Sequence, residues 1–177
     1  MTPWKDTVTT RNFLSLSVIA ALLIILSPGN ALAQQKSLKA QLVGTWKPVA
    51  VENLRPDGSK THVFGPTPLG ILIFSETGHF SLQALRPDVA KYVSNNRSQG
   101  TPDENKATVQ GGIHFFGTYT VNEVDQTFIF HIEGSSFPNY NGLDQKRHAA
   151  VNGDELHLTL DRVSAGGSAK QVWKRVK

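Results

Sequence analysis

Short segments in which apolar and polar residues alternate make up most of the chain after residue 44. They are rich in Val, Ile, Phe, Tyr and Thr, and turn-forming residues such as Arg55-Pro56-Asp57-Gly58 and Asn152-Gly153-Asp154 separate them. Alternation with a period of two, punctuated by such turns, is typical of antiparallel strands. The strands predicted in this way span residues 45–54, 70–74, 79–85, 113–121, 127–133, 145–151, 155–161 and 171–176.

Residues 86–110 interrupt the strand pattern with a polar segment. Thr101 is a favourable N-cap, Pro102 suits the first helical position, and Gly111-Gly112 follows as a stop. We therefore expect one short helix, over residues 102–110, in a segment that forms either a lid or a surface excursion. About eight antiparallel strands can close into a barrel that holds one small ligand and leaves no exposed sheet edge. The predicted fold class is an all-β antiparallel barrel.

The first 33 residues have a different pattern, that of an export signal. Lys5 and Arg11 precede an apolar run from Phe13 to Leu26, and the small residues Ala31-Leu32-Ala33 then fit a signal-peptidase site. The run is shorter than the roughly 20 residues of a bilayer span, which makes a retained anchor the weaker alternative. We expect a periplasmic or secreted protein with no integral membrane span after cleavage. The expected segments are a cleaved signal peptide (1–33), a polar leader (34–41) and the barrel domain (42–177).

Composition narrows the range of functions. The chain has no cysteine, so a domain outside the cytoplasm must rely on its core and not on disulfides. The formal net charge is +4, but the basic residues are scattered and do not alternate with aromatic ones, so nucleic acid is not an expected partner. The sequence gives no indication of a cofactor or of an oligomeric state.

Gly44-Thr45-Trp46 resembles the Gly-x-Trp start of the first lipocalin strand. Matches extend through Gly70–Phe74 and Phe116–Tyr119 to a more specific block at His131–Asn139, and the chain resembles the bacterial and fungal lipocalin-like domain family. The resemblance implies a lipocalin-like β-barrel over about residues 42–175, without a settled activity. In lipocalins the first-strand Trp packs across the closed end of the barrel beneath a basic side chain. The resemblance therefore implies structural roles for Gly44, Trp46 and Arg175, with Lys174 as an alternative to the arginine.

His131 and Glu133 alternate along one predicted strand and therefore share a face. A histidine beside a carboxylate is a pairing that general acid–base catalysis uses. Phe128 and Phe130 occupy the opposite face, and ordinary β patterning would turn them inward and leave His131 and Glu133 in water. The match to the family block favours an inward polar cluster instead, so both orientations remain open.

Gln145 and Arg147 share a face of the next predicted strand. If that strand folds back antiparallel, Arg147 would lie opposite Glu133 and form an ion pair. A zinc site using His131, Glu133 and His148 is disfavoured, because His148 has the opposite strand parity to Arg147 and no cysteine is present. No metal is predicted.

These observations favour an exported binding protein for a small hydrophobic or amphipathic molecule. Aromatic side chains would contact its apolar part, and polar side chains would orient its other end. The candidate ligand-binding residues are Tyr119, Phe128, Phe130, His131, Glu133, Ser135, Asn139, Gln145 and Arg147.

Two alternatives remain. The first is an isomerase, cyclase or hydrolase acting on a hydrophobic metabolite, with His131 as the acid or base, Glu133 orienting it, and Arg147 stabilising an oxyanion. The second is a structural envelope protein whose barrel is filled and binds no ligand.

Overall fold

A computed structural model describes Met1 and residues 36–164 and 166–177. Met1 apart, the expected signal peptide and residues 34–35 of the expected leader lie outside the described residues. The strands are β1 (Gly44–Leu54), β2 (Lys60–His62), β3 (Leu69–Phe74), β4 (His79–Leu85), β5 (Gly112–Asn122), β6 (Thr127–Ser135), β7 (Asp144–Asn152), β8 (Glu155–Leu160) and β9 (Ser168–Arg175). The helices are α1 (Leu38–Leu42) and α2 (Pro102–Gln110), with the 3-10 turns η1 (Arg97–Gln99) and η2 (Pro138–Tyr140).

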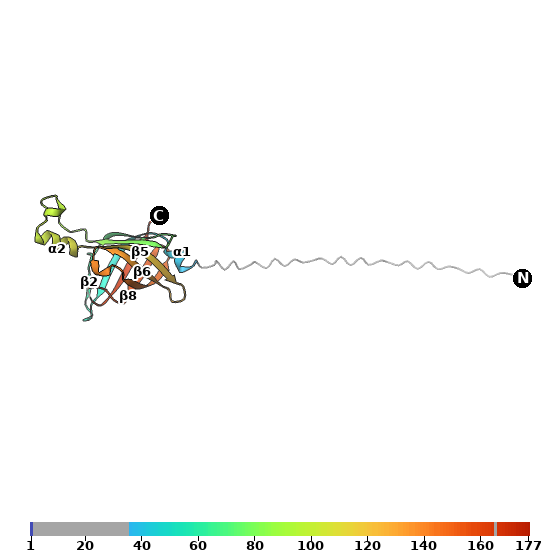
Figure 1. Ribbon diagram of the computed structural model, residues 1–177. Coiled ribbons are helices and arrows are strands. Elements are labelled where there is room, and N and C mark those ends of the chain that lie inside the picture. The colour runs from blue at the N-terminus through green and yellow to red at the C-terminus, as the bar shows by residue number, and fades with distance from the viewer. Residues whose placement is uncertain (2–35, 165) are drawn as a thin grey trace. The chain divides into compact units, whose positions relative to one another are not determined.

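The strands form one antiparallel sheet that curls into a closed barrel (Figure 1). From β3 to β9 each strand pairs with the next, and β1 pairs with both β3 and β9. The β1–β9 ladder runs from Trp46 opposite Arg175 to Leu54 opposite Ser168, and it closes the barrel. The short strand β2 is an addition that pairs with the last three residues of β1. The prediction of an all-β antiparallel barrel of about eight strands is confirmed.

The predicted strands and the helix at residues 102–110 are present, and no end differs from the prediction by more than three residues. The helix begins with a capping box, in which the side chain of Thr101 accepts from the backbone of Glu104 and the Glu104 side chain accepts in return. Helix α1 and strand β2 are not predicted by the pattern. Residues 38–41, expected in a polar leader, belong to α1, whose Leu38 and Leu42 are buried.

Helix α1 lies at one end of the barrel, where the first-strand tryptophan packs. Trp46 is buried and its Nε1 donates to the Leu42 carbonyl at 2.8 Å. The Arg175 guanidinium lies 4.0 Å from the Trp46 ring centroid and donates to the Val43 carbonyl at 2.8 Å. Gly44 has a φ of +130°, and a Cβ there would lie 2.8 Å from Arg175 Nη1. The Gly-x-Trp motif thus lets an arginine cover the closed end.

Aromatic rings fill the half of the barrel next to this end. Phe80 stacks on Phe130 with centroids 3.7 Å apart, and Phe74 meets Tyr119 edge-on at 5.0 Å and Phe128 at 5.3 Å. These side chains are at most 5% exposed. Because their rings occupy the interior here, any cavity must lie toward the opposite end.

The segment between β4 and β5 leaves the barrel at that opposite end. Figure 1 shows α2 and η1 lying beyond the strands, and no residue of either element is buried. Glu104 ties the segment together by accepting from Val93 N at 2.8 Å. Of α2, only Val109 and Gln110 border the cavity described below, and Val109 is exposed. In this structure the segment is a surface excursion that touches the cavity rim.

Candidate functional site

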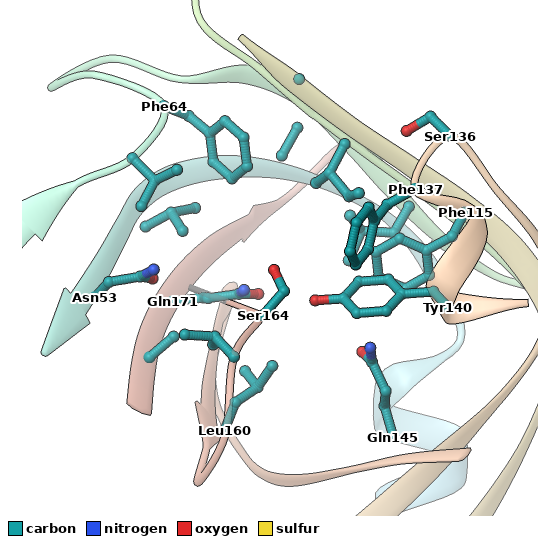
Figure 2. Close-up of a pocket in the computed structure, with 18 of the residues that line it drawn as sticks. Asn53, Phe64, Phe115, Ser136, Phe137, Tyr140, Gln145, Leu160, Ser164 and Gln171 are labelled. Carbon is teal, nitrogen blue, oxygen red and sulfur yellow. The ribbon is translucent and has the colours of Figure 1, made fainter. Parts of the chain in front are cut away.

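The open half of the barrel contains a cavity of about 230 Å³ (Figure 2). Its walls come from the ends of β1, β4, β5, β7, β8 and β9, and loops form the rim. Aromatic lining residues are Phe64, Phe115, Phe137, Tyr140 and Trp173. Polar lining residues are Asn53, Gln110, Ser136, Gln145, Arg147, Ser164 and Gln171. A concave, mostly apolar space with a few polar groups is the usual form of a small-molecule site.

Arg147 is the charged residue of this cavity. It lies on β7 and is 3% exposed. Nη1 donates to Gln171 Oε1 and Nη2 to Gln145 Oε1, each at 3.2 Å. The guanidinium carbon also lies 4.8 Å from the Phe130 ring centroid and 5.7 Å from that of Phe115. Within the described residues, its Nε is a buried polar atom that has no hydrogen-bond partner.

Burial dominates the electrostatics of this arginine. Removal from water lowers the pKa of Arg147 to about 9, and the nearby Tyr140 opposes this by raising it. The polar residues buried in the described part of the chain are Asn53, Thr127 and Arg147, and none of them is acidic. The charged form of the guanidinium is therefore held in the barrel at a cost in stability.

Strand register explains why Arg147 points inward. On β7 the residues Gln145, Arg147 and Ala149 alternate with more exposed neighbours. Arg147 pairs with Phe128 and Gln145 pairs with Phe130, and paired residues share a face of the sheet. The expected ion pair between Arg147 and Glu133 is therefore wrong, because the register sets Arg147 five residues away from Glu133 along β6.

His131 and Glu133 lie on the outer face of the barrel. The His131 Nδ1 is 2.7 Å from Asp144 Oδ1, and its Nε2 is 3.0 Å from Thr120 Oγ1. Glu133 is exposed, so Asp144 holds the position beside the histidine that the sequence suggested for Glu133. A hydroxyl, an imidazole and a carboxylate in line can serve acid–base chemistry, but none of these three groups lines the cavity. Of the two orientations left open for His131, the strand adopts the outward one.

Five of the other expected ligand-binding residues also lie apart from the cavity. Tyr119 donates to the Ser75 carbonyl at 2.8 Å in the filled half, where burial raises the pKa of its hydroxyl. Ser135 Oγ accepts from Phe137 N, and Asn139 is exposed on η2. Phe128 and Phe130 are fully buried beneath the cavity. Of the nine expected residues, Gln145 and Arg147 line it.

Several lining residues were missed because their significance depends on barrel closure. Gln171 and Trp173 alternate on β9, and Asn53 follows the buried Val51 on β1. Residues two apart on a strand share a face, so a position two residues from a buried apolar side chain faces the interior. That spacing is the signal that could have identified these residues. Tyr140 ends the three-residue 3-10 turn η2, which is too short to show a periodicity.

Among the described residues, no three His, Cys, Asp or Glu side chains lie close enough together to hold a metal ion. Over the same residues, no helix combines the length and the apolar character that a bilayer crossing requires.

The closed antiparallel barrel with an internal cavity is the architecture of lipocalin-like proteins. The family model for the lipocalin-like domain matches residues 43–176. The chain therefore belongs to the lipocalin-like domain family, and the resemblance noted in the sequence is confirmed.

Known proteins similar to this chain are divergent in sequence. The chain is 28% identical over 85 residues to a 4'-hydroxy-3'-methoxypropiophenone carrier protein of Aspergillus oryzae, a match covering 45% of this chain and 77% of that protein. Among solved structures, a redesigned β-barrel is 15% identical with a TM-score of 0.42, covering 81% of this chain and 98% of that one. A fatty acid transporter is 13% identical with a TM-score of 0.37, covering 78% of this chain and 98% of that one.

Proposed function

We propose that the protein binds one small hydrophobic or amphipathic molecule in the open half of its barrel and acts as a carrier. The observation that carries this proposal is the buried Arg147 on the wall of an otherwise largely apolar cavity. Its Nε–H has no hydrogen-bond acceptor among the described residues. Buried polar groups in folded proteins are normally paired. An unpaired one beside an open space supports a site that a ligand completes.

The size of the cavity supports a small ligand. Its volume of about 230 Å³ is below the range typical of drug-sized molecules, so a body of one or two rings is the best fit. Aromatic walls from Phe115, Tyr140 and Trp173 suit such a body. The name of the Aspergillus oryzae relative, a 4'-hydroxy-3'-methoxypropiophenone carrier protein, is compatible with this proposal.

The enzyme alternative receives less support. It needs His131 in contact with a bound substrate, and that side chain is on the outer face beside Asp144. The filled-barrel alternative is also weaker, since the open half retains its cavity.

A cavity-filling substitution tests the proposal. Ala84 is 2% exposed and lines the cavity, so Ala84→Phe should fill much of the space at a cost of roughly 1–3 kcal/mol in stability, and circular dichroism checks that the variant is folded. Ala150→Phe adds the same ring at an exposed position of β7 and is the matched control. Binding of neutral 2-naphthamide, followed by Trp fluorescence and calorimetry, should be lost in Ala84→Phe and kept in Ala150→Phe. Equal binding by both variants would contradict the proposed site.

We further propose that the protein is exported and works in a periplasm or in the medium. Support comes from the basic start, the apolar run from Phe13 to Leu26 and the small residues ending at Ala33. The mass of the mature protein from its natural compartment should correspond to a chain that starts at Gln34. A mass that includes residues 1–33 would contradict cleavage.

A further inference from the structure

Among the described residues, the positive charge of Arg147 has no counter-charge inside the barrel. Across residues 36–164 and 166–177, no acidic side chain is among the buried polar ones. The two side chains that accept hydrogen bonds from the guanidinium, Gln145 and Gln171, are neutral amides. Because a buried charge without an opposite partner is costly, this cavity would stabilise an anion.

The hydrogen bonds around Arg147 also determine what the cavity offers a ligand. Gln171 Oε1 accepts from both Arg147 and Trp173 Nε1, and Gln145 Oε1 accepts from Arg147. With both amide oxygens directed at Arg147, each glutamine has a nitrogen left for a ligand, and an amide nitrogen can only donate. Figure 2 shows Gln145 and Gln171 reaching the cavity from different strands. These polar groups therefore favour an acceptor with negative charge over an amine.

Arg147 itself has unused donor capacity. Its Nε–H makes no hydrogen bond within the described chain. Its two bonds of 3.2 Å are longer than usual for a charged donor. A small rotation of the guanidinium toward the cavity would present two adjacent N–H groups, and a carboxylate binds such a fork at two points.

We propose that the bound molecule is an organic anion, in which a body of one or two rings carries a carboxylate or a comparably acidic oxygen that pairs with Arg147. Gln145 and Gln171 hold the guanidinium in place and donate to the same group. The aromatic walls contact the apolar body. This inference rests on the proposed function, because it names the ligand class for that same cavity.

Two nearly isosteric probes, 2-naphthoate and 2-naphthamide, separate charge from shape. Their dissociation constants are measured by calorimetry for the unmodified protein, for Arg147→Met and for Arg147→Lys. Arg162→Met, which removes the same charge from an exposed position, is the matched control. The unmodified protein and Arg162→Met should bind the naphthoate roughly ten- to a hundredfold more tightly than the amide. Arg147→Met should lose that preference and still bind the amide, and Arg147→Lys should retain part of it.

The outcomes distinguish this inference from the proposed function. If the unmodified protein binds the amide as tightly as the naphthoate, the anion inference is overturned and the cavity remains a neutral binding site. If Arg147→Met still prefers the naphthoate to the amide as strongly as the unmodified protein does, the role of Arg147 is overturned. The ratio of the two dissociation constants for the unmodified protein tests the ligand class even where a variant does not fold. Binding of neither probe by folded protein overturns the proposed function as well.

Discussion

Replacing Arg147 with methionine should stabilise the ligand-free protein. Burial lowers the pKa of Arg147 from its ordinary value to about 9. At about 1.36 kcal/mol for each pKa unit, this difference corresponds to roughly 5 kcal/mol of unfavourable charge burial. A binding site that holds a charge ready for its ligand carries this cost while it is empty.

Other interactions of the guanidinium offset part of the cost. Its contacts with the Phe130 and Phe115 rings contribute roughly 2 kcal/mol, and the two bonds to Gln145 and Gln171 contribute roughly 1 kcal/mol each. Methionine keeps an unbranched apolar chain in contact with the same rings. The net gain from Arg147→Met is therefore about 1–2 kcal/mol, which raises Tm by roughly 3–8 °C.

Urea unfolding of the ligand-free proteins at neutral pH measures this difference. Arg175→Met is the matched control, because Arg175 covers the Trp46 ring and donates to backbone carbonyls at the closed end. That variant should lose about 2 kcal/mol. If Arg147→Met is instead destabilised by more than about 1 kcal/mol, the guanidinium stabilises the empty barrel, and the argument for an unsatisfied charge is refuted.

Three further predictions use the same geometry. First, the unfolded state binds more protons than the folded state above about pH 9. The stability deficit of the unmodified protein relative to Arg147→Met should therefore shrink as the pH rises through about 9, in unfolding curves recorded at several pH values. The affinity for 2-naphthoate should fall over the same rise as Arg147 loses its charge, whereas that for 2-naphthamide should stay constant. Second, His131→Ala should leave the affinity for both probes within about twofold in the same titrations, because His131 is outside the cavity; a larger loss would place it in the site. Third, Gly44→Ala should lower stability by about 2 kcal/mol in thermal unfolding, since its φ is +130° and its Cβ would crowd Arg175, whereas Gly153→Ala, at a positive φ with open space, should lose less.

The sequence predicts the barrel well because strand alternation is a local signal. Segments 79–85 and 127–133 alternate with a period of about two, with Phe80, Phe128 and Phe130 on the inward face, and both form strands. Strand β2 has three residues and helix α1 has five, too few for a period to be recognised. The position of α1 depends on contacts distant in sequence, for example Glu123 accepting from Leu38 N at 2.6 Å.

The site is harder to predict because it depends on register and closure. Parity alone identifies Gln145 and Arg147 as sharing a face, but only the pairing with Phe128 and Phe130 shows that this face is the interior. For His131, the apolar face opposite it gives the right orientation, while the family block favours the wrong one. Gln171 reaches Arg147 because the β8–β9 and β1–β9 ladders complete the barrel, which no local pattern reveals.

Nitrogen-15 NMR of the tryptophan indoles during a titration with 2-naphthoate is the decisive measurement. Trp173 lines the cavity and its Nε1 donates to Gln171 Oε1 at 3.1 Å, whereas Trp46 is buried at the closed end. If the cavity binds an anion beside Arg147, the Trp173 indole signal shifts and saturates while the Trp46 signal stays in place. Signals from both indoles that remain unmoved at millimolar 2-naphthoate would contradict binding in this barrel.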